Sequence, residues 1–167
     1  MTESTLSAIN PCLWFDTQAE DAARFYVSVF PNSRIDRVDR APADYPDGQA
    51  GNVLTVAFTL DGTPFVGLNG GPQFRFSEAI SFMVDCVDQA EVDRYWDTLT
   101  ADGGEPGPCG WLKDRFGLSW QIVPRQLGEL LRSEDRAGAG RAMAAMLKMH
   151  KIDVAELQRA FAGAATA

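Results

Sequence analysis

The segment Ile9-Asn-Pro-Cys-Leu-Trp-Phe-Asp-Thr-Gln-Ala-Glu20, followed by Arg24-Phe-Tyr26, has a counterpart roughly 70 residues further along the chain. The counterpart is Ile80-Ser-Phe-Met-Val-Asp-Cys-Val-Asp-Gln-Ala-Glu91, followed by Arg94-Tyr-Trp96. Each copy contains a short apolar run and then apolar residues at helical spacing. The pattern predicts an internal duplication of a buried strand followed by an amphipathic helix, and chance similarity is the alternative.

Each predicted helix has one apolar face and ends at residues that disfavour helix. Pro31 ends the first helix, and Gly103-Gly104 ends the second. The apolar faces consist of Ala22, Phe25, Tyr26, Val29 and Phe30 in the first helix and of Val92, Tyr95, Trp96 and Leu99 in the second.

Further strands are predicted after each helix. In the first half, Val53–Leu60 and Pro64–Leu68 flank a tight turn at Asp61-Gly62; in the second, Cys109–Lys113 and Leu118–Val123 flank a turn near Phe116-Gly117. The repeated unit is therefore read as strand, helix and three strands (βαβββ), which makes the fold class α+β. The turn-rich segment Arg40–Ala50 is expected to be a solvent-exposed loop, and capping of a cavity is the alternative.

Composition excludes several classes of protein. The chain has 167 residues, of which 46% are hydrophobic, and a net charge of −8. This describes a globular protein that does not bind nucleic acid in general, because an acidic surface repels phosphate backbones. The apolar runs are too short to span a membrane. Met1–Ser4 has no signal-peptide pattern.

The cysteines and the histidine restrict the chemistry. Cys12, Cys86 and Cys109 are too few for a disulfide framework, so a reducing, cytoplasmic setting is expected. His150 is the one histidine of the sequence, which excludes multi-histidine metal sites. We expect it to lie at a helix end and the three thiols to be structural, so no catalytic residue is named.

Charge divides the chain near Pro124. Residues 1–124 carry 18 acidic and 8 basic side chains, whereas residues 125–167 carry 5 and 7. We predict a main domain over 1–124, with modules of about 1–72 and 73–124, and a helical extension over 125–167. Helix starts are expected at Ser133 and at Asp153. A methionine-rich stripe of the extension is expected to pack on the main domain or on a partner chain; it consists of Met143, Met146, Leu147 and Met149.

Several strings resemble one protein family. They are Pro11–Phe15, Phe65–Pro72, Glu78–Phe82, Cys109–Asp114 and Ser119–Pro124. These strings resemble the PhnB-like branch of the vicinal oxygen chelate superfamily, often labelled 3-demethylubiquinone-9 3-methyltransferase. The superfamily includes glyoxalase I, extradiol dioxygenases and bleomycin-resistance proteins. The resemblance implies two βαβββ modules in an eight-stranded cup-shaped mixed sheet and a homodimer.

The resemblance also implies where a divalent metal would bind. The metal-ligand positions correspond to Pro11, to a residue near Gly67, to Ala79 and to Gln121. Three of these positions have no side-chain donor, and a lone amide oxygen is a poor ligand. We therefore expect no metal and no other cofactor. Glu78 does not restore the metal site, because alternation turns it away from Ala79. Methyl transfer is not assigned, since no glycine-rich strand-to-helix turn is present.

Alternation along the strands predicts the ligand-binding lining of the cup. The inward residues are Leu13, Phe15, Phe65, Asn69, Ser81, Met83, Ser119, Gln121 and Val123, with Trp111 at the rim or inside. The outward residues, expected under the helices, are Trp14, Val66, Leu68, Ile80, Phe82, Val84, Trp120 and Ile122. Such a lining suits an uncharged or aromatic small molecule, and a collapsed core without a cavity is the alternative.

These observations lead to three hypotheses of function. The first is a protein that binds a small apolar or aromatic molecule in the cup without the superfamily metal. The second is a divergent isomerase, lyase or dioxygenase that binds a metal at other residues. The third is a non-enzymatic interaction module, and whether the chain is an enzyme is left open.

Overall fold

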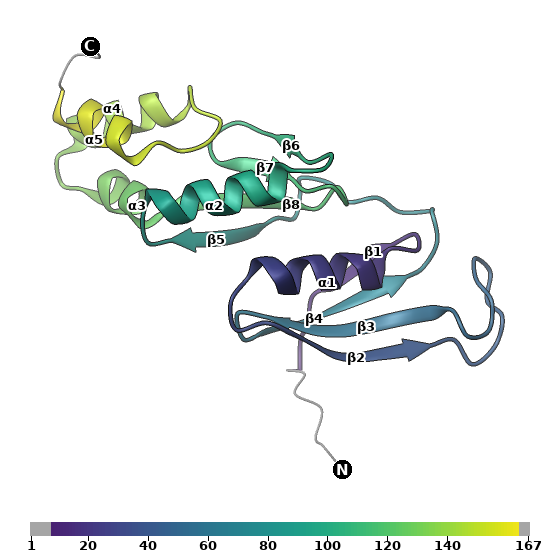
Figure 1. Cartoon of the computed structure of the whole chain (residues 1–167). Coiled ribbons are helices and arrows are strands. Elements are labelled where there is room, and N and C mark those ends of the chain that lie inside the picture. Colours follow the sequence, from purple (N-terminus) through teal and green to yellow (C-terminus); the bar gives the residue numbers. More distant parts are fainter. Residues whose placement is uncertain (1–7, 164–167) are drawn as a thin grey trace. The chain divides into compact units, whose positions relative to one another are not determined.

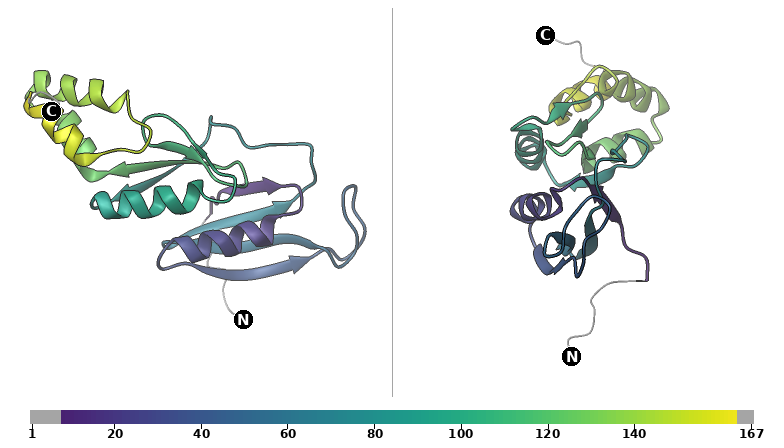
Figure 2. Two further views of the ribbon diagram at one scale, coloured as in Figure 1. Left: turned by 45° about the horizontal axis from the view of Figure 1, so that its top comes forward. Right: turned by 90° about the vertical axis from the view of Figure 1, so that its right-hand side faces the viewer.

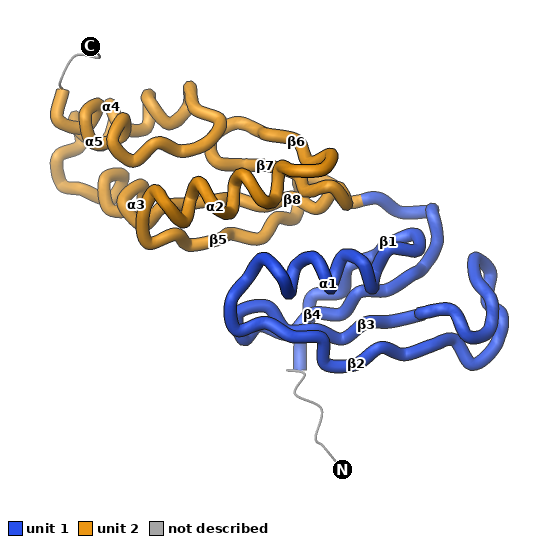
Figure 3. The backbone as a smooth tube through the Cα atoms, viewed as in Figure 1, with its two compact units in different colours: residues 1–75 blue, residues 76–167 orange. Residues whose placement is uncertain are grey.

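The computed structural model describes residues 8–163, which divide into two compact units. Unit 1 comprises residues 1–75 and unit 2 comprises residues 76–167, as coloured in Figure 3. Among the described residues, no helix has both the length and the apolar character needed to cross a membrane.

Unit 1 is one βαβββ module (Figure 1). Its elements are β1 (Cys12–Phe15), α1 (Ala19–Val29), β2 (Arg34–Arg40), β3 (Val53–Leu60) and β4 (Thr63–Asn69). The strand order is β1-β4-β3-β2, in which β1 runs parallel to β4 and the other neighbours are antiparallel.

Unit 2 begins with the same module. Its elements are β5 (Phe82–Cys86), α2 (Gln89–Thr100), β6 (Glu105–Pro106), β7 (Trp111–Lys113) and β8 (Ser119–Pro124). The order β5-β8-β7-β6, with β5 parallel to β8, repeats that of unit 1. The α+β class and the two βαβββ modules are thus confirmed, and the strands form two four-stranded sheets.

Each helix covers one face of the sheet of its own unit, as Figure 2 shows for α1. Tyr26 of α1 is fully buried beside Phe58, whose ring stacks on Phe65 at 5.5 Å between centroids. In α2 the buried residues are the four predicted ones, Val92, Tyr95, Trp96 and Leu99. Hydrophobic burial of these faces holds each helix to its sheet.

Strands β2 and β6 are the two that the sequence did not locate. In β2 five of the seven residues are charged, and acidic and basic side chains pair with each other, as in Arg34–Asp36 and Arg37–Asp39. Such charges suit a strand at a sheet edge but give no apolar pattern. β6 has only two residues and includes Pro106, which is tolerated at an edge.

Three helices follow the second sheet and belong to unit 2. They are α3 (Arg125–Arg132), α4 (Arg136–Met146) and α5 (Val154–Ala162). They enclose a small core of Leu127, Ile152 and Leu157, with Met146 and Met149 packed against it. Met143 and Leu147, also part of the predicted stripe, are exposed.

Side-chain caps begin two of these helices. Asp135 accepts a hydrogen bond from Gly138 N, so α4 begins two residues after the predicted Ser133. Asp153 accepts from Glu156 N at 2.9 Å and begins α5, as predicted. In both cases a carboxylate satisfies a backbone donor that has no partner within the helix.

Candidate functional site

The predicted direction of the side chains in unit 1 is wrong. Leu13, Phe15 and Phe65 lie on the face that α1 covers, and each is at most 5% exposed. A Cβ built on Gly67, in the same row as Leu13, would lie 3.2 Å from Ala19 Cβ of α1. These residues form the core of unit 1.

Asn69 also supports the helix. Its Oδ1 accepts a hydrogen bond of 2.8 Å from Ala19 N at the start of α1, and its Nδ2 donates to Val53 O at 3.0 Å. The other face of the sheet is the open one. It carries Cys12, which is exposed, and the half-buried residues Trp14, Val66 and Leu68, which were predicted to lie under the helix.

In unit 2 the predicted direction is right within the strands. It is wrong for Ile80, which was predicted to lie under the helix but lies before β5 and is 70% exposed. Trp120 and Ile122 are at most 3% exposed and lie on the face towards α2, whereas Gln121 and Met83 pair across β8 and β5 on the open face. Trp111 lies in the same row, opposite Gln121. Gln121 Nε2 donates a hydrogen bond of 2.9 Å to Ser81 Oγ. The open face of this sheet thus brings together Ser81, Met83, Trp111, Ser119 and Gln121.

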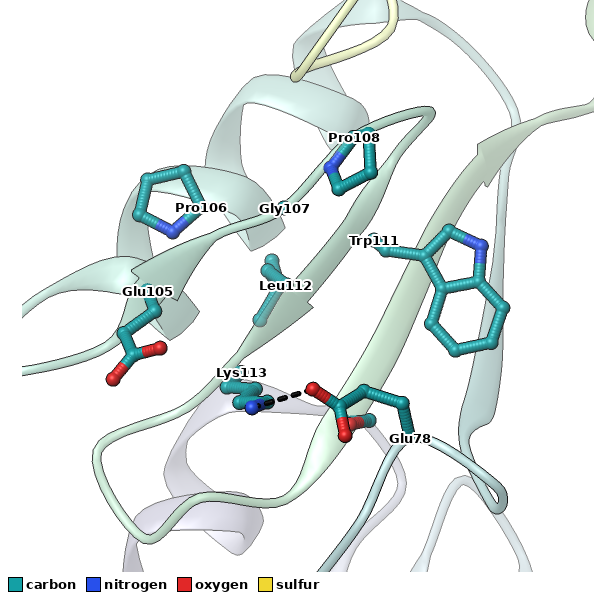
Figure 4. Close-up of a pocket in the computed structure, with 9 residues that line it drawn as sticks. Glu78, Glu105, Pro106, Gly107, Pro108, Trp111, Leu112 and Lys113 are labelled. Atoms are coloured by element: carbon teal, nitrogen blue, oxygen red, sulfur yellow. Dashed lines mark ion pairs between the residues drawn. The ribbon is translucent and has the colours of Figure 1, made fainter. Parts of the chain in front are cut away.

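A pocket of about 400 Å³ lies on this face. Of the predicted ligand-binding residues, Trp111 and Ser119 line it, and the remainder of the wall is Glu78, Glu105, Pro106, Gly107, Pro108, Leu112 and Lys113. Figure 4 shows the Trp111 indole beside Glu78.

An ion pair crosses the pocket. Lys113 Nζ lies 2.6 Å from Glu78 Oε1, and Figure 4 shows the two side chains facing each other. The hydrogen bond from Lys113 lowers the pKa of the Glu78 carboxyl, and the same bond raises the pKa of the Lys113 ammonium. Both groups are therefore charged at neutral pH.

The placement of Glu78 corrects the expectation from alternation. Residues 78–80 form a turn, and β5 begins only at Phe82. Period-two alternation holds within a strand and does not extend through a turn. Glu78 therefore lines the pocket, although alternation predicts that it points away.

Ser119 supplies an unusual group to this pocket. The residue is 1% exposed, and no described residue offers a hydrogen-bond partner to its Oγ. It pairs with Lys113 across β8 and β7, which places it beside the ion pair. A buried hydroxyl without a partner is costly, so this atom marks a place where a ligand or a water molecule would be stabilised.

The C-terminal extension holds one wall of the pocket. Cys109 N and Gly110 N donate to Met149 O and His150 O at 2.8 and 2.7 Å. His150 Nδ1 lies 2.9 Å from Gly107 O, so the predicted helix-end residue instead contacts the pocket loop. The loop closes on itself, because Gly107 N donates to Trp111 O at 2.8 Å. The extension therefore positions the residues from Gly107 to Trp111.

The wall residues that were not predicted have no local sequence pattern that indicates a pocket. Glu105 and Lys113 face each other across an edge hairpin whose first strand has only two residues. The proline and glycine residues between them predict turns and say nothing about a cavity.

Cys12, Cys86 and Asp114 have structural surroundings. Burial raises the pKa of Cys86 to about 12, and burial also raises the pKa of Cys12. Asp114 is buried and accepts three hydrogen bonds at the β7–β8 turn. Neither thiol is activated as a nucleophile, since a reactive cysteine has a lowered pKa.

The positions expected to hold a metal do not fit one. Pro11, Gly67 and Ala79 have no side-chain donor, and Gly67 faces α1 and not the open face. Gln121 offers one neutral amide oxygen, and its Nε2 donates to Ser81 Oγ. Within residues 8–163, no group of three or more histidine, cysteine, aspartate or glutamate side chains is suitably gathered for a metal ion. That the protein works without a metal stays a prediction.

Comparison with known proteins supports the family resemblance. The family described as 3-demethylubiquinone-9 3-methyltransferase matches residues 7–123. Among solved structures, the PhnB protein from Bacillus cereus is 31% identical, with a TM-score of 0.62 over 71% of this chain and 99% of that chain. No curated protein matches this sequence.

More distant structures share the fold. The fosfomycin resistance protein FosX from Mesorhizobium loti has a TM-score of 0.53 at 15% identity, over 80% of this chain and 100% of that chain. Protein PA1353 from Pseudomonas aeruginosa has the same TM-score at 16% identity, over 70% of this chain and 96% of that chain. The match over residues 7–123 and the similarity to PhnB show that the chain belongs to the 3-demethylubiquinone-9 3-methyltransferase (PhnB-like) family.

Proposed function

We propose that this chain binds a small organic molecule on the open face of the β5–β8 sheet, without a metal ion at the superfamily positions. The observation that carries the proposal is the pocket of about 400 Å³ with the buried, unpartnered Ser119 Oγ on its wall. That volume lies within the range typical of small-molecule sites, which are mainly apolar with a few placed polar groups.

The wall matches that description. Trp111, Leu112 and the prolines 106 and 108 supply apolar surface, and Ser119 supplies a hydrogen-bonding atom. An aromatic body stacked against the indole would bury the largest apolar area available on this wall. The pocket wall of unit 2 therefore supports the prediction of an aromatic or apolar ligand. The predicted lining residues of unit 1 do not support it, because they form the core of that unit.

The experiment is a thermal-shift screen of the full chain with aromatic and quinone-like compounds, preceded by native mass spectrometry to detect a copurifying ligand. A ligand at about 100 times its Kd stabilises the folded state by about 2.7 kcal/mol, which raises the melting temperature measurably. The Trp111→Ala variant is expected to lose this ligand-induced shift.

Phe74→Ala is the matched control, because Phe74 is an aromatic residue that is 65% exposed in unit 1 and does not line the pocket. The control should keep the ligand-induced shift. A shift that survives Trp111→Ala, or a screen and a mass spectrum that yield no ligand, would contradict the proposal. Stoichiometric divalent metal in the purified chain would instead favour the metal-dependent enzyme.

The homodimer and the cytoplasmic location stay predictions. Two exposed apolar residues support the homodimer: Ile80, in the turn before β5, is 70% exposed, and Met83, in β5, is 66% exposed in the single chain. Light scattering of the purified protein tests it, and a monomeric mass at micromolar concentration would contradict it.

A further inference from the structure

The charges on the pocket wall do not balance. Lys113 is ion-paired with Glu78, whereas Glu105, directly opposite Lys113 on β6, makes no ion pair with any described residue. The wall thus carries two carboxylates and one ammonium, a formal charge of −1 at neutral pH. The Lys113 pKa is raised mainly by the hydrogen bond and the charge of Glu78, and the Glu105 charge adds to that rise.

Ser119 is a second, independent indication of a ligand. Its hydroxyl oxygen is buried on this wall and has no partner among the described residues. A serine oxygen accepts hydrogen bonds as well as donating one. A ligand group with an N–H or O–H bond would satisfy it.

Trp111 supplies the third element of the wall. Its indole is half-buried, and no described cationic side chain lies over its ring. The face of an indole attracts cations more strongly than other aromatic rings do. The unoccupied ring, the unpaired carboxylate and the buried hydroxyl all favour the same kind of ligand.

We propose that this pocket selects a small organic cation, namely a protonated amine carried on an aromatic or apolar body. This inference rests on the proposed function and specifies its ligand class. The amine N–H bonds to Ser119 Oγ, and the apolar body lies against Trp111. Glu105 lies two strands from Ser119, beyond Lys113, so it acts on the amine through the net charge of the wall and not by a direct contact.

An anionic ligand fits this wall less well. Its natural partner, Lys113, is already 2.6 Å from Glu78. The charge of Lys113 is thus already compensated by Glu78, so an incoming anion would meet a wall with a net charge of −1 and two nearby glutamates. Like charges repel each other, which weakens binding.

The test uses three probes that share a phenyl body and differ in charge: 2-phenylethylamine, 2-phenylethanol and 3-phenylpropanoate. Binding to the full chain is measured at pH 7.5 by calorimetry and by intrinsic tryptophan fluorescence. We expect the amine to bind about tenfold more tightly than the alcohol, with the carboxylate weakest.

Two variants locate the effect. Glu105→Gln should reduce amine affinity about fivefold and leave alcohol affinity unchanged, because it removes only the charge. Glu129→Gln is the matched control, since it removes one negative charge from an exposed position on α3 and should change neither affinity. Ser119→Ala should weaken both the amine and the alcohol.

The outcomes separate the two proposals. Equal or tighter binding of the alcohol or the carboxylate, or an amine affinity that Glu105→Gln leaves unchanged, would overturn the cation selectivity and leave small-molecule binding intact. Absence of binding by all three probes at about 10 mM, where a millimolar Kd gives near saturation, would overturn both.

Discussion

Trp120 Nε1 donates a hydrogen bond of 2.8 Å to Asp114 Oδ2, and the two residues are 3% and 2% exposed. The other carboxylate oxygen accepts from Phe116 N at 2.8 Å and from Leu118 N at 3.1 Å. One buried carboxylate therefore holds the β7–β8 turn together and fixes the Trp120 indole on the face of the sheet that α2 covers.

Replacing Asp114 by asparagine is expected to lower the free energy of unfolding by about 1–3 kcal/mol. One carboxylate oxygen becomes an NH2 group, which cannot accept from either the indole or the backbone donors. Chemical denaturation of the two proteins measures the difference. Asp102→Asn is the control, because Asp102 is exposed and forms only a surface ion pair with Arg115. Its effect should stay within about 0.5 kcal/mol, and equal effects of the two variants would refute the buried role of Asp114.

Gly110→Ala should lower the free energy of unfolding by more than the cost of placing an alanine in the left-handed backbone conformation. Gly110 has φ of +83°, and a Cβ built there would lie 2.8 Å from Ile122 O. Gly117 has φ of +84° but no neighbour within 4 Å of such a Cβ. Gly117→Ala should therefore cost about 1–2 kcal/mol from the left-handed conformation, and Gly110→Ala clearly more. Thermal unfolding of the two variants measures the difference. An equal loss of stability in both would show that the contact between the new Cβ and Ile122 O is relieved without cost.

Cys86 is expected to resist alkylation in the folded protein at pH 8, whereas Cys12 should react. Burial raises the pKa of Cys86 to about 12, and the residue is 0% exposed. Cys12 is exposed, although burial of its thiol raises its pKa as well. Mass spectrometry after timed exposure to iodoacetamide distinguishes the sites, and unfolding in denaturant should make them equally reactive. Early modification of Cys86 would contradict its buried placement.

Lys151 links the C-terminal extension to α2 by ion pairs with Asp93 at 3.0 Å and Asp97 at 3.5 Å. Hydrogen bonds from Gln89 and Lys151 lower the Asp93 pKa below its usual 3.8, so this contribution is lost as the pH falls through that lowered value. The hydrogen bond to Asp93 raises the Lys151 pKa above its usual 10.5, so the contribution is also lost as the pH rises through the raised value.

The Lys151→Met variant should accordingly be less stable than the parent protein between about pH 5 and pH 10, by at most about 1 kcal/mol because the pair is partly exposed. The difference in unfolding free energy should shrink towards both extremes of pH. Glu134→Gln, at an exposed position before α4, serves as the control. If the difference in unfolding free energy persists at pH 3, the ion pairs do not cause it, and packing of the Lys151 methylene groups does.

Much of the fold was accessible from local sequence patterns. The predicted strand Val53–Leu60 has the bounds of β3, and the apolar face of α2 contains its four predicted residues. Asp61 and Gly62 both have positive φ, as the predicted tight turn requires. These features depend on interactions between residues close in sequence, which is why a single sequence reveals them.

The face of each sheet that its helix covers could not be predicted in the same way from local patterns. Around Leu13 and Trp14 both faces of the strand are apolar, so alternation assigns residues to two faces but does not identify the face that packs on α1. The helix decides, through its small residues Ala19, Ala22 and Ala23. In unit 2 the contrast between Gln121 and Ile122 made the choice clear.

The sequence by itself determined the duplicated module and the cap of α5 at Asp153, because both are a matter of residue type and short-range spacing. Only the tertiary structure decided the pocket. Glu78, Glu105 and Lys113 come from a turn and two short strands, and strand pairing brings them to one wall beside Ser119. The electrostatic field of that wall arises from distances in space, which no local pattern in the chain encodes.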